Sequence, residues 1–305
     1  MLIRFIKKTP NLNFTGNRNF FFLTSGLLSI ISIVFMIIKG LNFGIDFKGG
    51  LLIETSFNQD IEIVQIRTKL SQIVTGDFSI QSLDNSKNNY LIKVETNSSA
   101  QGANQKLISE IKKNLNKEYS NVDYRRVEYV GPTVSKELIK AGIFSIIIAI
   151  GAMLVYIWFR FELPFAIGAV VALIHDIVLT VGMFSISSLE FNLATVAAIL
   201  LIIGYSMNDT VVVYDRIREN LKKFRKISII TLLNKSVNET LSRTINTTAT
   251  TILALLALFI FGGNIIKDFS FAMIWGIIIG TYSSILIATP VLVFLNIKRS
   301  ENKED

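Results

Sequence analysis

The chain contains no cysteine, which excludes disulfides, thiol nucleophiles and thiolate metal sites from all 305 residues. We expect no metal site and no bound cofactor. Charged residues are also scarce, at 18% against about a quarter in a typical soluble domain. Hydrophobic residues make up 50% of the chain. This composition argues against a soluble globular protein.

The apolar residues gather into runs too long for the core helices of a soluble protein. A helix needs about 20 apolar residues to cross roughly 30 Å of hydrocarbon. The first run is too long for the apolar part of a signal peptide, and no alanine precedes Ala100 to form an A-x-A cleavage site, so we expect an uncleaved anchor. The predicted spans are residues 20–38, 139–159, 164–185, 191–213, 245–261 and 269–294.

Basic residues lie on one side of these spans. Residues 1–19 carry four basic side chains and no acid, and residues 214–243 carry eight basic against three acidic ones. The short loops on the other side hold one basic residue, Lys267, and residues 42–135 carry eleven charges of each sign. By the positive-inside rule, both termini face the cytoplasm. The net charge of +8 therefore reflects topology, and no nucleic-acid partner is expected.

These patterns divide the chain into segments. The cytoplasmic loop near 214–242 contains an amphipathic stretch, residues 228–241, which we expect to lie along the membrane surface. The segments are a cytoplasmic N-terminus (1–19), a first span (20–40), an extracytoplasmic domain (41–135), five further spans (136–297) and a cytoplasmic tail (298–305).

The extracytoplasmic domain alternates between strand and helix periodicity. A strand pattern at 51–57 is followed by a helical pattern through Ile73, capped by Asp60; two strand patterns, a helix from Ala103 to Leu115 and a last strand follow. The order β-α-β-β-α-β predicts a ferredoxin-like fold. The domain lacks histidine and a glycine-rich phosphate loop, so we expect a binding or mechanical role and no enzyme activity.

Ionisable residues inside the spans are the strongest functional candidates, since each costs at least about 2.5 kcal/mol at a helix centre. They are His175 and Asp176 in the third span, Asp209 in the fourth and Arg243 at the start of the fifth. Counted from the outer ends of their spans, Asp209 and Arg243 both lie at a depth of about 27 Å, so we predict that they neutralise each other. Snorkelling of Arg243 to the membrane surface is the alternative, and His175 can equally serve packing.

Two further patterns concern polar and small residues. Beyond Arg243, Asn246, Thr247, Thr250 and Thr251 recur at helical spacing and predict a hydrated file leading outward; alternatively, the hydroxyls bond their own helix or a neighbouring one. Small residues recur every fourth position and predict close helix packing, one such stripe being open to another subunit. These stripes are Gly276, Gly280, Ser284 and Ala288, and Ala141, Ser145 and Ala149.

Three segments carry a family resemblance. Residues 43–50 read FGIDFKGG, residues 204–219 read GYSMNDTVVVYDRIRE, and residues 239–251 read ETLSRTINTTATT. With His175-Asp176 and Gly262-Gly263, they resemble the SecF members of the SecD/SecF protein-export family, within the RND superfamily of proton-driven membrane machines. The likeness covers nearly the whole chain. It implies an α-helical polytopic membrane protein, half of an RND-like assembly, with an inserted α+β ferredoxin-like domain.

The resemblance also implies a function. A member of this family works in the bacterial inner membrane with SecD and the SecYEG channel. It uses the proton-motive force, or a sodium gradient, to draw an unfolded polypeptide outward after SecA has acted; YajC and YidC are further expected partners. The family's coupling residues fall on Asp209 and Arg243, with secondary candidates at Asn208, His175, Asp176, Asn246 and Thr247. Apart from the resemblance, the glycines in the two connections to the domain can adopt dihedrals that other residues resist, which predicts hinges. The hinge and motif candidates are Asp46, Gly49, Gly50 and Gly131.

Two alternatives stay open at this point. One is half of an RND-type efflux transporter, although such pumps usually carry a larger outer domain with a substrate pocket. The other is a structural subunit of the translocon, since a pair of membrane charges can be purely architectural.

Overall fold

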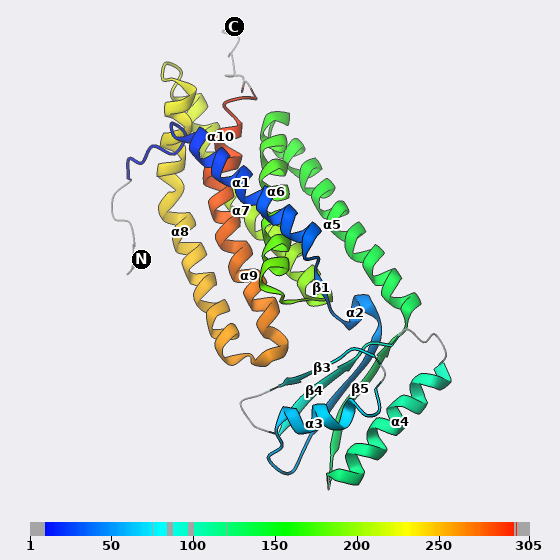
Figure 1. Ribbon diagram of the computed structural model, residues 1–305. Coiled ribbons are helices and arrows are strands. Elements are labelled where there is room, and N and C mark those ends of the chain that lie inside the picture. The colour runs from blue at the N-terminus through cyan, green and yellow to red at the C-terminus, as the bar shows by residue number, and fades with distance from the viewer. Residues whose placement is uncertain are drawn as a thin grey trace.

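The computed structural model describes residues 10–74, 76–83, 88–96, 101–119, 121–295 and 297. A bundle of long helices forms one part of the molecule, and a small α+β domain lies at one end of it (Figure 1). The start of α1 and the α7–α8 connection lie at the opposite end of the bundle.

Six helical segments are long and apolar enough to cross a membrane, which confirms the six predicted spans. Three of them, α6, α7 and the last span, have more than half of their apolar windows buried and form the interior; in the other three, at most 11% of the window is buried. The apolar side chains of these outer helices face lipid or another protein. The spans are α1 (Arg18–Ile38), α5 (Pro132–Arg160), α6 (Leu163–Ser187), α7 (Leu193–Lys223), α8 (Ile229–Phe261) and Ile266–Val291.

The last span changes helix type near its end. It consists of α9 (Gly263–Ser283), a π-helical turn η1 (Ser284–Ala288) and α10 (Thr289–Val291). Pro290 has no backbone N–H to donate, and the Thr289 hydroxyl donates to the Ser284 carbonyl at 3.0 Å. The widened turn leaves the Ala288 carbonyl to accept from the buried Tyr214 hydroxyl of α7 at 3.1 Å. The bond to Tyr214 ties this end of the last span to α7.

The small α+β domain, which contains β2 to β5 and is called the outer domain from here on, has the predicted ferredoxin-like fold. Its strands are β2 (Gly50–Ser56), β3 (Phe78–Ser82), β4 (Asn89–Val94) and β5 (Asp123–Val130). They pair in the order β3-β4-β2-β5, and every neighbouring pair is antiparallel. The helices α3 (Ile63–Leu70) and α4 (Gln101–Glu118) contribute Ile66, Leu70, Ile111 and Leu115 to a core shared with Leu51, Ile53 and Ile92.

The predicted cap of the domain's first helix is wrong. The residue at the N-cap of α3 is Glu62, in extended conformation and without a side-chain capping bond, rather than Asp60. The helix ends at Leu70, and Ile73 follows in a turn. The fold tolerates the missing cap because Ile66 and Leu70 are fully buried and supply packing instead. The side chain of Ala103, predicted to be buried in the second helix, lies outside the described residues.

The prediction of a separate helix on the cytoplasmic membrane surface is also wrong. Residues 229–241 are the first turns of α8, which runs unbroken to Phe261 and packs antiparallel against α7. Asn220 of α7 donates to Ser236 and to Glu239 of α8, at 2.9 and 2.8 Å. These buried polar bonds hold the amphipathic stretch against α7, so it extends the bundle as a helical hairpin.

The segment before α1 is tied to this hairpin. The Asn234 side chain accepts from the Phe14 N–H at 2.8 Å, and the Asn238 side chain both accepts from and donates to the Leu12 backbone at 2.9 Å. The first described residues of the chain therefore pack against the start of α8.

Two short elements that the sequence does not reveal connect the outer domain to the bundle. The strand β1 (Asn42–Phe43) pairs in parallel with β6 (Glu190–Phe191), which lies in the α6–α7 connection. A one-turn helix, α2 (Ile45–Lys48), then leads into β2. The chain between α1 and the domain is thus ordered and bound to the bundle.

Candidate functional site

The Asp209 carboxylate is buried in the middle of α7, with 2% of the residue exposed. Among the described residues, it accepts one side-chain hydrogen bond, a long one from the Thr281 hydroxyl of α9 at 3.4 Å. Thr281 in turn lies 2.9 Å from the Thr248 hydroxyl of α8. A chain of polar groups therefore joins α7, α9 and α8 at this carboxylate.

Arg243 is exposed on α8, and no ion pair within 4.0 Å joins it to Asp209. Its guanidinium acts on the carboxylate only through space. Two bonds between α7 and α8 fix their register, Tyr205 to Thr251 at 3.2 Å and Asn220 to Ser236 at 2.9 Å. In this register Arg243 lies about one turn, or roughly 6 Å, further from the outer domain than Asp209.

The predicted matching of depths is therefore wrong by one turn. It assumed that Phe191 and Phe261, the outer ends of the two predicted spans, are level, whereas in this register Phe261 lies about one turn further from the outer domain than Phe191. The two charges remain near neighbours in the bundle without contact.

Asp176 on α6 is the better-bonded carboxylate. It is 1% exposed and accepts from the Ser206 hydroxyl of α7 at 2.7 Å and from the Ser283 hydroxyl of α9 at 2.8 Å. The Nδ1 atom of His175 lies 3.1 Å from its other oxygen. Three neighbouring groups thus hold this carboxylate at the junction of the three interior helices.

His175 belongs to the same cluster. It is 8% exposed, and its ring stacks on Tyr282 of α9 with centroids 6.1 Å apart. Its Nε2 atom is buried without a hydrogen-bond partner. One ring nitrogen of His175 is thus bonded to Asp176, and the other is unpaired among the described residues.

Sequence reasoning missed the hydroxyl residues that surround both carboxylates. Serine and threonine in a span are commonly bonded to their own helix, so Ser206, Thr281 and Ser283 had no distinguishing mark. The small-residue stripe of α9 was the available signal, because it faces α7 within the chain. A Cβ placed on Gly280 would lie 2.8 Å from that of Ser206, and Ser284 lies 2.8 Å from the Thr210 hydroxyl.

The threonine hydroxyls of the polar stripe on α8 bond to their own helix, which is the alternative to a hydrated file. The hydroxyls of Thr247, Thr250 and Thr251 donate to carbonyls three or four residues earlier in α8. Asn246 Oδ1 is buried without a partner. Asn208 is exposed in a groove between α7 and α5, beside Tyr156 and away from the α8 stripe, so these residues do not line one site. The hydrated file stays a prediction.

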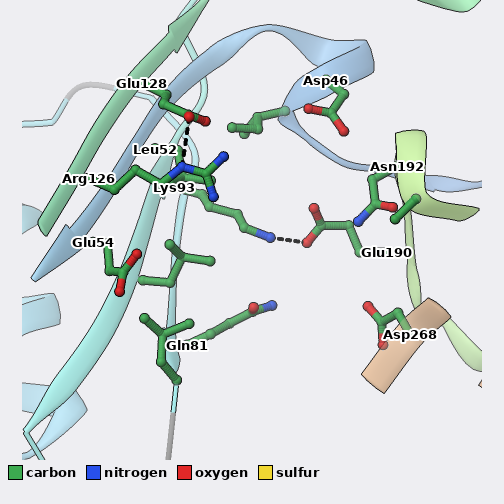
Figure 2. A pocket seen from close by; sticks show the side chains of 14 residues that line it. Asp46, Leu52, Glu54, Gln81, Lys93, Arg126, Glu128, Glu190, Asn192 and Asp268 are labelled. Carbon is green, nitrogen blue, oxygen red and sulfur yellow. Dashed lines mark hydrogen bonds and ion pairs between the residues drawn. The ribbon is translucent and has the colours of Figure 1, made fainter. Parts of the chain in front are cut away.

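A cleft of about 250 Å³ separates the open face of the sheet from the bundle. Figure 2 shows Lys93 of β4 reaching across it to Glu190 of β6, with which it forms an ion pair. Arg126 bonds Glu128 at 2.7 Å, and this bond raises the pKa of the Arg126 guanidinium. Asp46, Glu54 and Asp268 add three more acidic groups.

The motif glycines lie where the two connections to the domain meet. Gly49 has φ of +82° and follows α2, a conformation that glycine adopts without strain. Gly50 pairs with Val130 in the sheet, and Gly131 is the N-cap of α5. The two connections therefore meet at the first residue pair of the β2–β5 ladder, at the end nearest the bundle, and their role as hinges stays a prediction.

Comparisons with known proteins agree with this geometry. A profile of the family described as protein export membrane protein SecD/SecF, C-terminal, matches residues 110–298, and one of the SecD/SecF GG motif matches residues 34–61. Proteins named protein translocase subunit SecF are 41% identical over 300 residues in Rickettsia bellii and 43% over 298 residues in Rickettsia typhi. These alignments cover 98% and 97% of this chain, and 98% and 96% of those proteins.

Solved structures show the same relationship. The crystal structure of SecDF from Thermus thermophilus, titled a translocon-associated membrane protein, matches with a TM-score of 0.81 and 32% identity over 94% of this chain. A structure of SecDF in a super-membrane-facing form matches with a TM-score of 0.70. The present chain spans 39% of the length of either SecDF chain. By sequence and by fold, the chain belongs to the SecD/SecF family of protein-export membrane proteins, on the SecF side.

Proposed function

We propose that this protein is a SecF-type subunit that works with SecD, in the bacterial inner membrane, to drive export of unfolded polypeptides by an ion gradient. Its relatives are named translocase subunits, and the SecDF chain that it matches is longer than itself by a region that a SecD partner would supply. The observation that carries the proposal is the Asp209 carboxylate, buried at mid-helix with a single long hydrogen bond.

The proposed orientation places the outer domain on the far side of the membrane. The basic residues favour a cytoplasmic α7–α8 hairpin, and this hairpin lies at the end of the bundle opposite to the domain (Figure 1). Exported chains would then meet the domain after leaving the SecYEG channel. SecA, YajC and YidC are proposed neighbours on the strength of the family alone.

In the proposed cycle, Asp209 takes up a proton and the electrostatic attraction between Asp209 and Arg243 is lost. A buried carboxylate without a contact ion pair is costly to keep charged, which favours uptake when the gradient supplies a proton. One charge crossing about 100 mV is worth about 2.3 kcal/mol. Driving a two-state element from about 1:99 to 99:1 takes about 5.5 kcal/mol. Two protons, or one proton and a smaller shift in population, would therefore supply free energy of the right order. A sodium ion carries the same charge and would supply the same amount.

Arg243 fits a role at the subunit boundary. It is exposed on α8, an outer helix with only 11% of its apolar window buried, and an uncompensated guanidinium in lipid is unfavourable. A carboxylate of SecD is the natural group to meet it. The α5 stripe at Ala141 and Ser145 is also exposed, so it is the stripe that remains for contact with another subunit.

His175 and Asp176 form a second, adjoining place for a proton. Ser206 of the Asp176 cluster lies one turn before Asp209 on α7, so a proton relay between the two carboxylates needs only a short hydrogen-bonded path. We assign this pair a secondary role.

The test is a complementation experiment in a strain depleted of SecF. The wild-type chain, Asp209→Asn and Asp176→Asn are expressed with SecD, and export of a secreted reporter is measured with and without an uncoupler. The proposal predicts uncoupler-sensitive rescue by the wild type and loss of rescue in Asp209→Asn. Rescue that is equally strong with the uncoupler would favour the structural-subunit alternative. Isolation of the complex without channel subunits would favour the efflux-transporter alternative.

A further inference from the structure

The α6–α7 connection is bound to the segment that follows α1. The Gly44 N–H donates to the Phe191 carbonyl at 2.9 Å, beside the β1–β6 pair. The rings of Phe43 and Phe47 each lie 6.0 Å from that of Phe191. Backbone bonds and aromatic packing together fix this connection on the outer end of the bundle.

Asp46 completes the N-terminus of α7. Its Oδ2 atom accepts from the Leu193 N–H, the first residue of α7, at 3.0 Å. The Asn192 side chain accepts from the Thr195 N–H at 3.1 Å as the other half of the cap. A carboxylate is favourable at this positive end of a helix. The helix that carries Asp209 therefore begins on a side chain of the segment leading to the outer domain.

Lys93 and Glu190 add a direct bond between the domain and the same connection. Lys93 projects from β4, an interior strand, and its side chain is 13% exposed against 14% for Glu190. Arg126 is engaged by Glu128 at 2.7 Å, and the remaining charges that line the cleft are acidic. Among the described residues of the cleft, Lys93 is thus the cation that faces Glu190 (Figure 2).

We propose that Lys93 and Glu190 form a latch that makes the outer domain and the outer end of α7 move as one body. The latch, the Asp46 cap and the β1–β6 pair all act on residues 190–193, so a displacement of α7 is passed to the domain without an intervening hinge. Lys93 and Glu190 are positioning residues for the export stroke, and this part of the inference rests on the proposed function.

The first test measures distance and does not depend on export. Spin labels are placed through Val64→Cys on α3 and Leu201→Cys on α7, both exposed positions in a chain that has no native cysteine. In the SecD-containing complex in lipid nanodiscs, the latch predicts one narrow distance distribution. Lys93→Gln should broaden it by about twofold or more, because removing one partner leaves the other charge uncompensated. The double variant Lys93→Glu/Glu190→Lys should narrow it again.

The matched control is Lys69→Gln. It also removes a lysine–glutamate ion pair, to Glu118 at 2.7 Å, but this pair is exposed to solvent and joins two residues of the outer domain. Lys69→Gln should therefore leave the distance distribution unchanged. An unchanged distribution in Lys93→Gln, or equal broadening in the control, overturns the latch.

The second test asks whether the latch stays closed during export. Lys93→Gln should lower uncoupler-sensitive export several-fold, and the charge-swapped double variant should recover at least about half of the wild-type rate. Lys93→Cys/Glu190→Cys joined by a short bismaleimide should export at the wild-type rate. A joined complex that assembles but stops exporting overturns the proposal. Failure of the wild-type chain to export would instead strike the proposed function, while the distance measurement still decides the latch.

Discussion

Asp209 on α7 and Arg243 on α8 lie one helical turn out of register and share no ion pair within 4.0 Å. The carboxylate is buried, whereas the guanidinium is exposed on an outer helix. In the function proposed above, Asp209 would respond to an arriving cation, and Arg243 would meet a neighbouring subunit.

The first prediction concerns the Asp209 charge. Asp209→Asn keeps the shape of the side chain and the bond from Thr281 but removes the titrating group. If one charge per step is coupled, the loss of about 2.3 kcal/mol lowers the gradient-driven export rate by roughly 50-fold. Export into inner-membrane vesicles with an imposed gradient measures this rate. Asp215→Asn is the control, because Asp215 is half-exposed and pairs with Arg160 at 3.0 Å; equal losses in both variants would refute a special role for Asp209.

The second prediction concerns the shape of the cation. Arg243→Lys keeps the charge but loses the planar fork that binds a carboxylate through two parallel bonds. We expect a several-fold loss of export if Arg243 meets a carboxylate of the partner. Near-normal export in the same vesicle assay would favour the snorkelling alternative.

A third prediction tests the packing of α7 on α9. Gly280→Ala would place a methyl group 2.8 Å from the Ser206 Cβ, beside the Asp176 cluster. We expect a loss of about 1–3 kcal/mol in stability from overpacking, measured as a lower unfolding temperature of the purified complex in mild detergent. Gly151→Ala on the open face of α5 has no neighbour within 4 Å and should leave the temperature unchanged or slightly raised. A similar fall in both would show that the α7–α9 contact is not tight.

The fourth prediction tests orientation. A cysteine introduced by Asn88→Cys in the outer domain should react with a membrane-impermeant maleimide added to intact cells stripped of their outer membrane. Lys223→Cys at the exposed end of α7 should react only after the membrane is opened. The reverse pattern would overturn the proposed topology.

The fifth prediction tests movement of the outer domain. An engineered disulfide between this domain and the outer domain of SecD should block export, and reduction should restore it, while assembly of the complex is unaffected. A locked complex that exports at the full rate would make the domain a static platform.

The parts of this structure that follow from periodicity could be predicted from the sequence. Six long apolar runs gave the six spans, and alternating periods gave the ferredoxin-like order of the outer domain. Asp176 and Asp209 stood out because a carboxylate in a span is rare. The α7–α8 hairpin could not be predicted, because an amphipathic stretch fits a helix packed on a neighbour as well as one lying on a membrane.

The remaining features depend on contacts between distant residues. The β1–β6 pair has only two residues in each strand, too few for any pattern. Ser206 and Ser283 meet Asp176 only because three helices converge there. The one-turn offset of Arg243 depends on how α7 and α8 are aligned along each other, which is set by contacts between the two helices and which hydropathy does not record.

The parallel pairing of residues 42–43 with residues 190–191 also dictates an order of biogenesis. All strands of the outer domain have been synthesised once Val130 leaves the ribosome. The domain can therefore fold before its docking site on the bundle, residues 190–193, has been made. Glu190 and Leu193 follow about 60 residues later, after α5 and α6 have entered the membrane. Docking of the domain on the bundle is consequently a late maturation step. Variants that weaken this docking site should produce a folded but undocked domain. Proteases should then cleave the segment between α1 and β2 more readily.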